Sequence, residues 1–272
     1  MPELAEVETV INTLKYQLGN VKIIGCKMLY SKLSEMNMEQ FIVNQTIRNY
    51  TRYGKYLIFE LDDYIWITHL RMEGKFYIVD PNELIDKHIH AIFDLDNGLQ
   101  LRYHDTRKFG RMYIYPKNND LKSYPCFKNV GLDLFDKQLT PTYIYDEFSK
   151  RKYTLKQALL DQSIIAGIGN IYSDEICYAL QLHPLCKANT LTMNQCEELL
   201  KVSKEILTNA IKAGGTTIRS YTSSLKVDGR FQLQLKVHSK KGEKCQACGN
   251  EIIKIKVGGR GTYVCDKCQK IQ

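Results

Sequence analysis

Four cysteines arranged in two pairs near the C-terminal end are the feature that most restricts the fold of this chain. Two residues separate Cys245 from Cys248, two separate Cys265 from Cys268, and 16 residues lie between the pairs. Four thiolates at this spacing are typical of a tetrahedral Zn²⁺ site built on two knuckles. Because all four protein ligands are cysteines, no coordination position is left for a substrate. The sequence therefore predicts one structural zinc ion, which stabilises a segment too small to fold alone.

The stretch "EIIKIKVGGRGTYVC" between the pairs has the composition of two strands joined by a turn. Arg260 stands between Gly259 and Gly261, at the expected tip of this hairpin. One interpretation is an exposed charge with no special role. The other is a contact to phosphate, because a guanidinium binds phosphate through two parallel hydrogen bonds.

The cysteine count and the N-terminus indicate the compartment. Nine cysteines form an odd total, and the acidic N-terminus lacks the basic and apolar regions of a signal peptide, so a disulfide framework is not expected. The five scattered cysteines are predicted to be small buried residues. No apolar run approaches the roughly 20 residues of a membrane span. We expect a soluble, cytoplasmic protein with no membrane partner.

The net charge of +8 is unevenly distributed. Residues 236–272 hold nine Lys and Arg against three Asp and Glu. A basic segment of this kind suits a polyanion such as nucleic acid. Ordinary solubilising charge is the alternative, so charge alone does not decide between them.

The first ten residues, "MPELAEVETV", have two interpretations. Apolar side chains at helical spacing over residues 3–18 predict a helix that ends at Gly19, and proline and acidic residues suit its first turn. The second interpretation is chemical. If Met1 is removed, Pro2 becomes a chain-terminal secondary amine that can attack an electrophilic carbon.

Seven short strand-like runs follow, separated by turn signals such as Asp96-Asn97-Gly98. The runs are "VKIIGCKMLY", "KYLIFEL", "YIWITHL", "KFYIV", "HAIFDLD", "LQLRYHD" and "RMYIY". Strands at this spacing predict a β-sandwich or barrel, on which the first helix packs.

The pattern changes after residue 115. The stretch 116–140 is rich in Pro, Asn and Gly and is interpreted as a linker. Helical spacing then predicts helices over about 141–150, 154–161, 170–181 and 192–213. A polar, Gly/Ser/Thr-rich segment at 213–230 is expected to be a mobile loop.

The sequence "AGIGN" lies between the second and third of these helices. Gly167 and Gly169 allow a sharp turn, and Asn170 is a good N-cap for the helix that follows. The exposed N–H groups of such a helix start can bind a DNA phosphate, with Arg151 and Lys156 as nearby cations. Glycine turns between helices are also common structural features, so this signal is moderate by itself.

Several motifs together resemble one family, formamidopyrimidine-DNA glycosylase. They occur in family order from Pro2 to Cys268: "PELAEVETV", "THLRMEGKF", "KHIH", "LRYHDTRKFG", "LLDQSIIAGIGNIYSDE", "GGTTIRSY" and the paired cysteines. The resemblance implies an α+β chain in four parts. These are an N-terminal catalytic β-sandwich domain with an N-terminal helix (1–115), a linker (116–140), a helical helix–two-turn–helix DNA-binding domain (141–235) and a zinc-finger ribbon (236–272).

The resemblance also implies the reaction. The family removes oxidised purines such as 8-oxoguanine and formamidopyrimidines in base-excision repair, and then cleaves the abasic strand by β,δ-elimination. Pro2 would attack C1′ and form a Schiff base, with Glu3 as general acid/base and Glu6 ordering the site. Lys55 would donate the proton for β-elimination, and Arg260 would promote δ-elimination. A solvated lysine at a strand end is the plainer interpretation of Lys55.

The expected partner is double-stranded DNA that contains an oxidised base or an abasic site, bound by a monomer. The DNA contacts implied by the resemblance are His88, Arg107, Arg151, Lys156, Asn170, Met72 and Phe109. Met72, Arg107 and Phe109 match the trio that fills the space left by an extruded lesion, although core packing is the ordinary role of Met and Phe. Thr216 to Tyr221 matches the lid over the flipped base. His88 and His90 could suggest a metal pair, but no Cys or acidic partner supports it.

Three departures from the family pattern leave the catalytic groups intact. Ala5 stands where the family usually has proline, Ile89 replaces an acidic residue, and "KVHSKKGEKC" replaces the usual run before the ribbon. They bear on DNA geometry and lesion preference. Two other functions stay open at this point: a zinc-ribbon DNA-binding protein without catalysis, and an enzyme of the same fold that prefers oxidised pyrimidines.

Overall fold

The computed structural model describes residues 1–118, 120–216 and 230–271. The chain divides into two compact units. The first comprises Met1–Lys128 and Gly214–Gly229, and the second comprises Asn129–Ala213 and Arg230–Gln272. The four-part division at 115, 140 and 235 stays a prediction.

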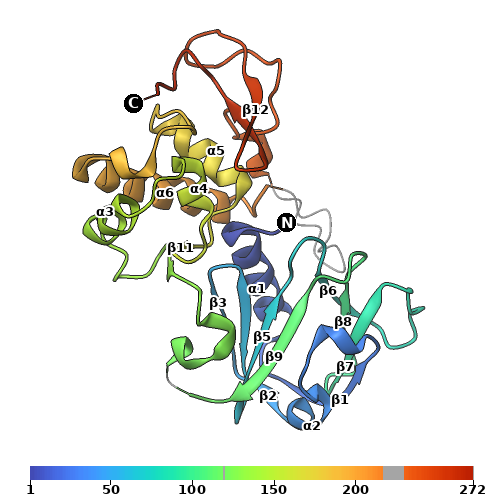
Figure 1. Cartoon of the computed structure of the whole chain (residues 1–272). Coiled ribbons are helices and arrows are strands. Elements are labelled where there is room, and N and C mark those ends of the chain that lie inside the picture. Colours follow the sequence, from blue (N-terminus) through green and yellow to red (C-terminus); the bar gives the residue numbers. More distant parts are fainter. Residues whose placement is uncertain (119, 217–229, 272) are drawn as a thin grey trace. The chain divides into compact units, whose positions relative to one another are not determined.

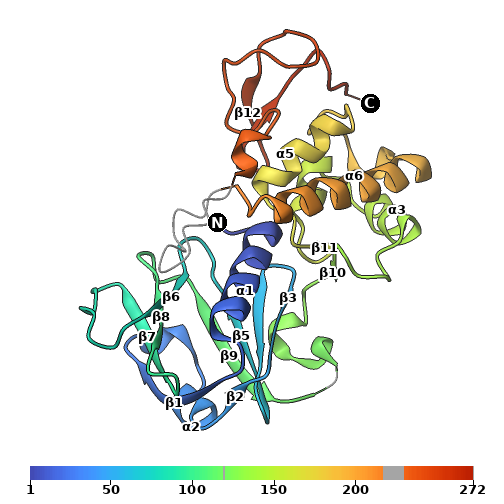
Figure 2. The same ribbon diagram turned by 180° about the vertical axis from the view of Figure 1, so that it is seen from behind.

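Helix α1 (Leu4–Leu18) opens the first unit, as the apolar spacing predicted. Its apolar residues Leu4, Val7, Val10, Ile11, Leu14 and Leu18 are all buried. The helix ends at Gly19, where φ is +56° and the backbone N–H donates to Lys15 O. The buried stripe packs α1 against β3 and β4, beside the sheet seen in Figures 1 and 2.

Two antiparallel sheets make up the rest of the first unit. Their strand orders are β3-β4-β5-β9 and β2-β1-β7-β8-β6. The strands are β1 (Val21–Met28), β2 (Thr46–Ile47), β3 (Asn49–Tyr53), β4 (Tyr56–Glu60), β5 (Tyr64–His69), β6 (Lys75–Val79), β7 (Ile89–Leu95), β8 (Gln100–His104) and β9 (Arg111–Pro116). A short helix, α2 (Met38–Ile42), packs against β1, β5 and β9.

One apolar core joins the two sheets into a sandwich. Trp66 of β5 stacks on Phe59 of β4 with 4.2 Å between ring centres, and it also meets Phe93 of β7 at 4.6 Å. Each of these large side chains contributes about 1.5–3 kcal/mol by leaving water. The predicted sandwich is therefore present.

The second unit contains helices around a buried central helix, α5. Its elements are β10 (Leu132–Asp133), α3 (Pro141–Ser149), α4 (Leu155–Leu160), β11 (Ile165–Ala166), α5 (Asn170–Ala179) and α6 (Met193–Lys212). Helix α6 packs on α3 and α5, and α4 packs on α5. Thr154 and Thr192 close capping boxes at the starts of α4 and α6, because each side chain accepts the backbone N–H three residues on.

The zinc-finger ribbon lies in the same unit. Strands β12 (Ile253–Val257) and β13 (Arg260–Val264) form a hairpin that contacts α5 through β13. The backbone N–H groups of Lys236, Val237 and His238 all donate to the Glu175 carboxylate of α5. The segment that leads into the ribbon is thereby fixed to the same helix.

Several local features differ from the sequence predictions, including α2 and β2, which no predicted run covers. Strand β3 was not predicted, because "NYTRY" is polar and its place in the sheet depends on pairing with β4. Gly169, not Asn170, is the N-cap of α5, and Asn170 is the first helical residue. The stretch 116–140 is not featureless, since it contains 3₁₀ turns at Leu121–Ser123 and Pro125–Phe127 as well as β10.

Residues 217–229 of the predicted loop at 213–230 lie outside the described residues. In the part of the chain that is described, no helix has the length and apolar composition needed to cross a bilayer.

Candidate functional site

Pro2 stands directly before α1, beside two buried carboxylates. Pro2 is half-buried and Met1 is exposed. Glu3 and Glu6 are only 3% and 5% exposed. The backbone N–H of Glu3 donates to Glu6 Oε2 at 2.9 Å, as part of a capping box. The start of the helix therefore places Pro2 next to two buried carboxylates in the chain.

Glu6 also joins α1 to a distant segment of the same unit. The backbone N–H and the hydroxyl of Thr216 donate to Glu6 Oε1 at 2.9 and 3.0 Å. Gly215 has a φ of +77°, and a Cβ on it would lie 2.9 Å from Glu6 Oε1. Glycine is therefore required here. The predicted lid, Thr216 to Tyr221, begins at this contact, and its remaining residues lie outside the described ones.

Lys55 lies at the turn between β3 and β4 and is buried, so it is not a solvated strand-end lysine. The register of β4 and β5 places Tyr56 opposite His69. His69 Nδ1 accepts the Arg71 backbone N–H at 2.9 Å. Burial, and then the charges of Arg71 and Lys55, lower the pKa of His69 to about 3. The imidazole is neutral at physiological pH and adds no second positive charge beside Lys55.

Two loops carry the residues predicted to fill the space of an extruded base. Met72 lies between β5 and β6, while Arg107 and Phe109 lie between β8 and β9. Met72 is half-buried, Arg107 is exposed and Phe109 is 48% exposed. The Arg107 guanidinium carbon lies 4.8 Å from the centre of the Phe109 ring. An exposed phenyl ring covered by an arginine is not core packing.

His88 and His90 have different environments. His88 is half-buried, with its ring edge-on to His104 at 5.6 Å between centres. His90 is buried, and its Nε2 lies 2.8 Å from Asp105 O. Because a carbonyl can only accept, His90 Nε2 carries the proton. Among the described residues neither histidine belongs to a cluster of metal-ligating groups.

The four predicted zinc ligands converge in the ribbon. Their Sγ atoms all lie within 4.8 Å of one another. The Sγ atoms of Cys245 and Cys268 are 3.8 Å apart, and those of Cys248 and Cys265 are 3.5 Å apart. A tetrahedral ion with Zn–S bonds of about 2.3 Å separates its sulfur ligands by about 3.8 Å. The four thiols thus fit one Zn²⁺, which is structural because no ligand position is left for a substrate.

A tyrosine of α5 supports this site. The Tyr178 hydroxyl lies 3.2 Å from Cys245 Sγ. Burial raises the pKa of the Cys245 thiol, but hydrogen bonds from Tyr178 and from the N–H groups of Ala247 and Cys248 outweigh burial and lower that pKa to about 6. These bonds favour the thiolate, which is the form that binds zinc.

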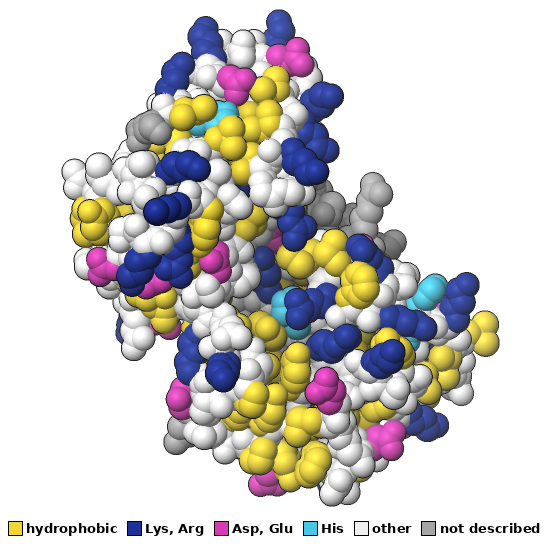
Figure 3. Space-filling model, in the orientation of Figure 1, with side chains coloured by type: hydrophobic (Ala, Val, Ile, Leu, Met, Phe, Trp, Pro, Cys, Tyr) yellow, Lys and Arg dark blue, Asp and Glu magenta, His cyan; other side chains and the backbone are white. Residues whose placement is uncertain are grey.

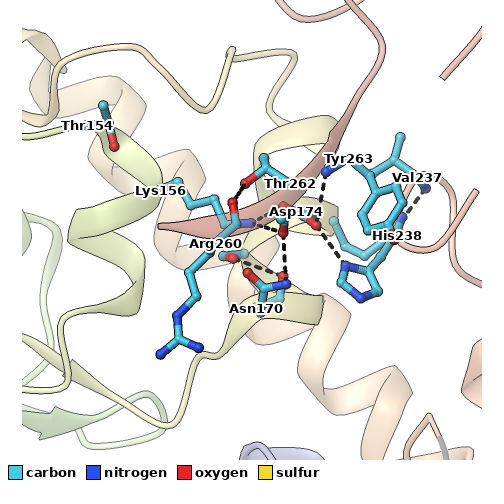
Figure 4. Close-up of polar contacts among 12 residues, drawn as sticks. Thr154, Lys156, Asn170, Asp174, Val237, His238, Arg260, Thr262 and Tyr263 are labelled. Atoms are coloured by element: carbon cyan, nitrogen blue, oxygen red, sulfur yellow. Dashed lines mark hydrogen bonds and ion pairs between the residues drawn. The ribbon is translucent and has the colours of Figure 1, made fainter. Parts of the chain in front are cut away.

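A buried charge network lies between α4, α5 and the hairpin (Figure 4). Lys156 and Asp174 are fully buried, and Lys156 Nζ donates to Asp174 Oδ1 at 2.5 Å. The other carboxylate oxygen accepts from His238 Nδ1 at 2.7 Å and from the Tyr263 backbone N–H at 3.3 Å. The Lys156 ammonium is thus shielded from solvent by its own unit. Lys156 therefore has a role inside the second unit, and its contact with DNA stays a prediction.

The tip of the hairpin is attached to the start of α5. Gly261 O accepts from Asn170 Nδ2 at 3.1 Å and from Lys156 Nζ at 3.5 Å. The Arg260 side chain points away from this network, as Figure 4 shows. Its guanidinium is exposed and has no hydrogen-bond partner within residues 1–118, 120–216 and 230–271. Arg260 is a free cation on a fixed backbone.

Arg151, also predicted to contact DNA, is half-buried next to α3. Its guanidinium forms an ion pair with Glu147 at 2.8 Å and also donates to Glu147 O.

Lys and Arg side chains outnumber acidic ones on the face of the molecule seen in Figure 3. This surplus agrees with the net charge of +8.

The sequence reasoning missed four residues that organise these places: His69, Asp105, Asp174 and His238. Asp174 and His238 carried no local signal, because their partners are distant in the chain. Asp105 did carry one, since an aspartate followed by a short polar stretch and a glycine is typical of a turn that its side chain closes.

Comparison with protein families covers most of the chain. The family profile described as "Formamidopyrimidine-DNA glycosylase N-terminal domain" matches residues 1–112, and that described as "Formamidopyrimidine-DNA glycosylase H2TH domain" matches residues 130–222. A third profile, "Zinc finger found in FPG and IleRS", matches residues 242–271.

Full-length relatives agree with these profiles. The formamidopyrimidine-DNA glycosylase of Oceanobacillus iheyensis is 43% identical over 99% of this chain and 98% of its own length, and that of Bacillus licheniformis is 41% identical over 99% and 100%. A solved structure of the wild-type Lactococcus lactis Fpg (MutM) with DNA containing N7-benzyl-Fapy-dG is similar at a TM-score of 0.91 and 37% identity, over 99% of this chain and 100% of that one. The chain therefore belongs to the formamidopyrimidine-DNA glycosylase family, whose members are DNA glycosylases of base-excision repair.

Proposed function

We propose that this protein is a bifunctional DNA glycosylase and AP lyase that removes oxidised purines from duplex DNA as a monomer. The observation that carries the proposal is the position of Pro2 directly before the buried carboxylates Glu3 and Glu6. The lesions bound by solved relatives support the substrate class. One is a Lactococcus lactis FPG mutant with DNA containing Fapy-dG, and another is MutM with DNA containing carbocyclic 8-oxo-G.

The first step needs a free amine on Pro2, and therefore removal of Met1. A terminal amine has a pKa of about 8, so a useful fraction is neutral near pH 7. The positive end of the α1 dipole disfavours the charged amine, while Glu3 and Glu6 favour it. The neutral nitrogen attacks C1′, and the bond from C1′ to the base breaks with its electron pair on the base, which takes up a proton.

The second step converts this adduct into an iminium. The nitrogen loses its proton and its lone pair opens the sugar ring, so that the ring oxygen leaves C1′ and takes up a proton. We assign Glu3 to these proton transfers at the sugar, because its carboxylate lies next to Pro2 in the chain and is buried. Glu6 orders the site through its bonds to Glu3 and Thr216.

Strand cleavage follows from the same iminium. Its positive nitrogen acidifies the C2′ proton, which passes to the Glu3 carboxylate as the 3′ phosphate leaves C3′ with its electron pair. Lys55 supplies the proton in this β-elimination. Arg260 promotes the second elimination, which releases the 5′ phosphate, and also binds phosphate through its fork of N–H donors. Water then hydrolyses the Pro2 adduct.

The remaining groups bind DNA. His88, Arg151 and Asn170 contact the DNA backbone, while Met72, Arg107 and Phe109 fill the space left by the extruded base. A flexible thioether, a forked cation that can face the orphan cytosine and an aromatic wedge suit this role. The zinc ion keeps the hairpin folded and supplies no reaction step.

The test is reductive trapping. Borohydride added to the protein and a duplex with one 8-oxoguanine should yield a covalent protein–DNA adduct of one-to-one mass. A matched protein that retains one residue before Pro2 has an amide in place of the amine, so it should give no adduct. Intact-mass measurement confirms which form is present in each sample. Equal trapping by both proteins would exclude Pro2 as the nucleophile.

The same assay separates the alternatives. A panel of duplexes carrying oxidised purines or oxidised pyrimidines identifies the preferred lesion. Preference for the pyrimidines would overturn the proposed substrate class but leave the Schiff base in place. Tight DNA binding without cleavage or trapping would instead indicate a zinc-ribbon DNA-binding protein.

A further inference from the structure

The two loops that carry Met72, Arg107 and Phe109 cross between the sheets at the same edge of the sandwich. The loop at 70–74 runs from β5 in one sheet to β6 in the other, and the loop at 105–110 runs back from β8 to β9. The ladders place His69 opposite Arg111 and Lys75 opposite His104, so both ends of the two loops are paired. The two loops therefore lie side by side both where they leave and where they enter the sheets.

Asp105 is the centre of the second loop. Its side chain is fully buried, although Thr106, Arg107, Lys108 and Phe109 are all exposed. One carboxylate oxygen accepts the Arg107 backbone N–H at 2.9 Å. The other accepts the backbone N–H groups of Phe109 and Gly110, each at 2.9 Å. A single carboxylate thus binds three of the five N–H groups that follow it.

The backbone N–H and carbonyl of Asp105 also form hydrogen bonds. Its N–H donates to His88 O at 3.0 Å, and its carbonyl accepts the proton of His90 Nε2 at 2.8 Å. Within the turn, Lys108 has a φ of +58°, a conformation that non-glycine residues rarely adopt. The bonds to Asp105 compensate for that strain and keep the chain turned.

Tyr103 links this loop to the loop of Met72. Its hydroxyl lies 3.5 Å from the Asp105 carboxylate, and its side chain is fully buried. A Cβ on Gly110 would lie 1.7 Å from the hydroxyl oxygen, and a Cβ on Gly74 would lie 2.3 Å from it. One oxygen atom is therefore in close contact with the backbone of both loops, and both positions require glycine.

We propose that Asp105, together with Tyr103, is a positioning residue for lesion extrusion. The pair sets the Arg107–Phe109 stack and the Met72 loop in one arrangement before DNA binds, so that little conformational freedom is lost when the three side chains enter the duplex. This inference rests on the proposed void-filling role of these side chains. Asp105 itself is fully buried, so it acts through the residues that it holds.

The first test is made on the free protein and does not depend on activity. In Asp105→Asn the side-chain NH2 group replaces one of the two acceptor oxygens and faces backbone N–H donors. The backbone N–H groups of Arg107, Phe109 and Gly110 should therefore exchange with deuterium at least 10-fold faster than in the wild type. The matched control is Asp96→Asn. Asp96 also accepts a backbone N–H, that of Lys22 at 3.1 Å, in the same unit but in the turn between β7 and β8. Unchanged exchange at 105–110 in Asp105→Asn would overturn the proposal.

The second test compares two substrates under single-turnover conditions. Asp105→Asn should slow excision of 8-oxoguanine from a duplex by 10-fold or more, but should slow cleavage of a preformed abasic site much less, because no base must be unpaired there. Tyr103→Phe removes only the hydroxyl and should shift the same ratio in the same direction. Equal losses on both substrates would indicate a general structural defect and would overturn the positioning role.

Phe109→Ala tells the two levels of the proposal apart. If Phe109→Ala slows excision and Asp105→Asn does not, the Phe109 side chain takes part in excision, but the order that Asp105 gives to the loop before DNA binds does not matter. The inference on Asp105 is then wrong. If Phe109→Ala leaves excision unchanged, the proposed void-filling role is wrong, and with it the use that this inference assigns to the loop. The exchange experiment then still reports separately whether Asp105 holds the loop.

Discussion

Lys156→Met should strongly destabilise the second unit, although the residue makes no contact with solvent. The substitution keeps most of the side-chain volume and removes the ammonium that faces Asp174 Oδ1. Asp174 is fully buried, and among the described residues it keeps His238 Nδ1 and the Tyr263 N–H as donors. Removing one partner of a buried ion pair typically costs about 3–5 kcal/mol, because the remaining charge cannot be solvated.

The double variant Lys156→Met, Asp174→Asn distinguishes this cause from lost packing. It has no uncompensated charge, so it should recover a large part of the stability lost in Lys156→Met. The matched control is Lys240→Met, which breaks the exposed pair between Lys240 and Glu243 at 3.0 Å. An exposed pair of this kind contributes about 0.2–1 kcal/mol.

Calorimetric unfolding measures these differences. For a unit of this size about 1 kcal/mol corresponds to about 2–4 °C in Tm, so Lys156→Met should lower the Tm by on the order of 10 °C and Lys240→Met by no more than a few degrees. If Lys156→Met and Lys240→Met behave alike, Asp174 does not depend on Lys156 and the reasoning from burial fails.

Three further predictions concern single groups. Arg260→Ala should leave the Tm unchanged, because its guanidinium has no described partner, and should reduce the slope of log Kd against log salt by about 1, as loss of one phosphate contact requires. Cys265→Ala should lose zinc, measured by metal analysis, and DNA affinity together; full DNA affinity after zinc loss would contradict the role of the ribbon. His69 has a pKa of about 3 in the folded protein, lowered from 6.5 chiefly by burial, so protonation favours unfolding as the pH falls below 6.5. Between pH 7 and 5 the free energy of unfolding of the wild type should fall by about 2 kcal/mol more than that of His69→Gln. If the free energies of unfolding of the two proteins depend on pH in the same way, His69 is not held neutral in the folded protein.

Local patterns predicted the elements whose burial repeats at a regular period. Strands β4, β5, β7 and β8 are almost continuously buried and were predicted from apolar composition and the turn signals between them. Helix α1 and strands β6 and β9 follow the periodic rule, because their residues are buried at the spacing of their own geometry. Strand β3 does not, since only one residue of "NYTRY", Tyr50, is buried, and backbone pairing with β4 makes the segment a strand. Such pairing has no signature in the segment itself.

The zinc centre was predictable from sequence because its ligands are a fixed residue type at a fixed spacing. Lys156 was not, because the burial of a lysine depends on a carboxylate that lies 18 residues away in sequence and on a hairpin more than 100 residues away. A cation next to a glycine turn suggests a phosphate contact until its partner is seen. The fold, and not the motif, decides whether such a charge reaches solvent.

The bond between Glu6 and Thr216 has a consequence for how the chain is made. The first unit consists of residues 1–128 and 214–229, so its final piece is synthesised only after α3 to α6 have emerged. Until Thr216 leaves the ribosome, the Glu6 carboxylate lacks two of its donors and must stay hydrated. Because domains generally fold in order of synthesis, the sandwich can form early while the head of α1 is completed last. A nascent or truncated chain that ends before residue 214 would thus contain the folded sheets, but would lack the ordered carboxylate next to Pro2.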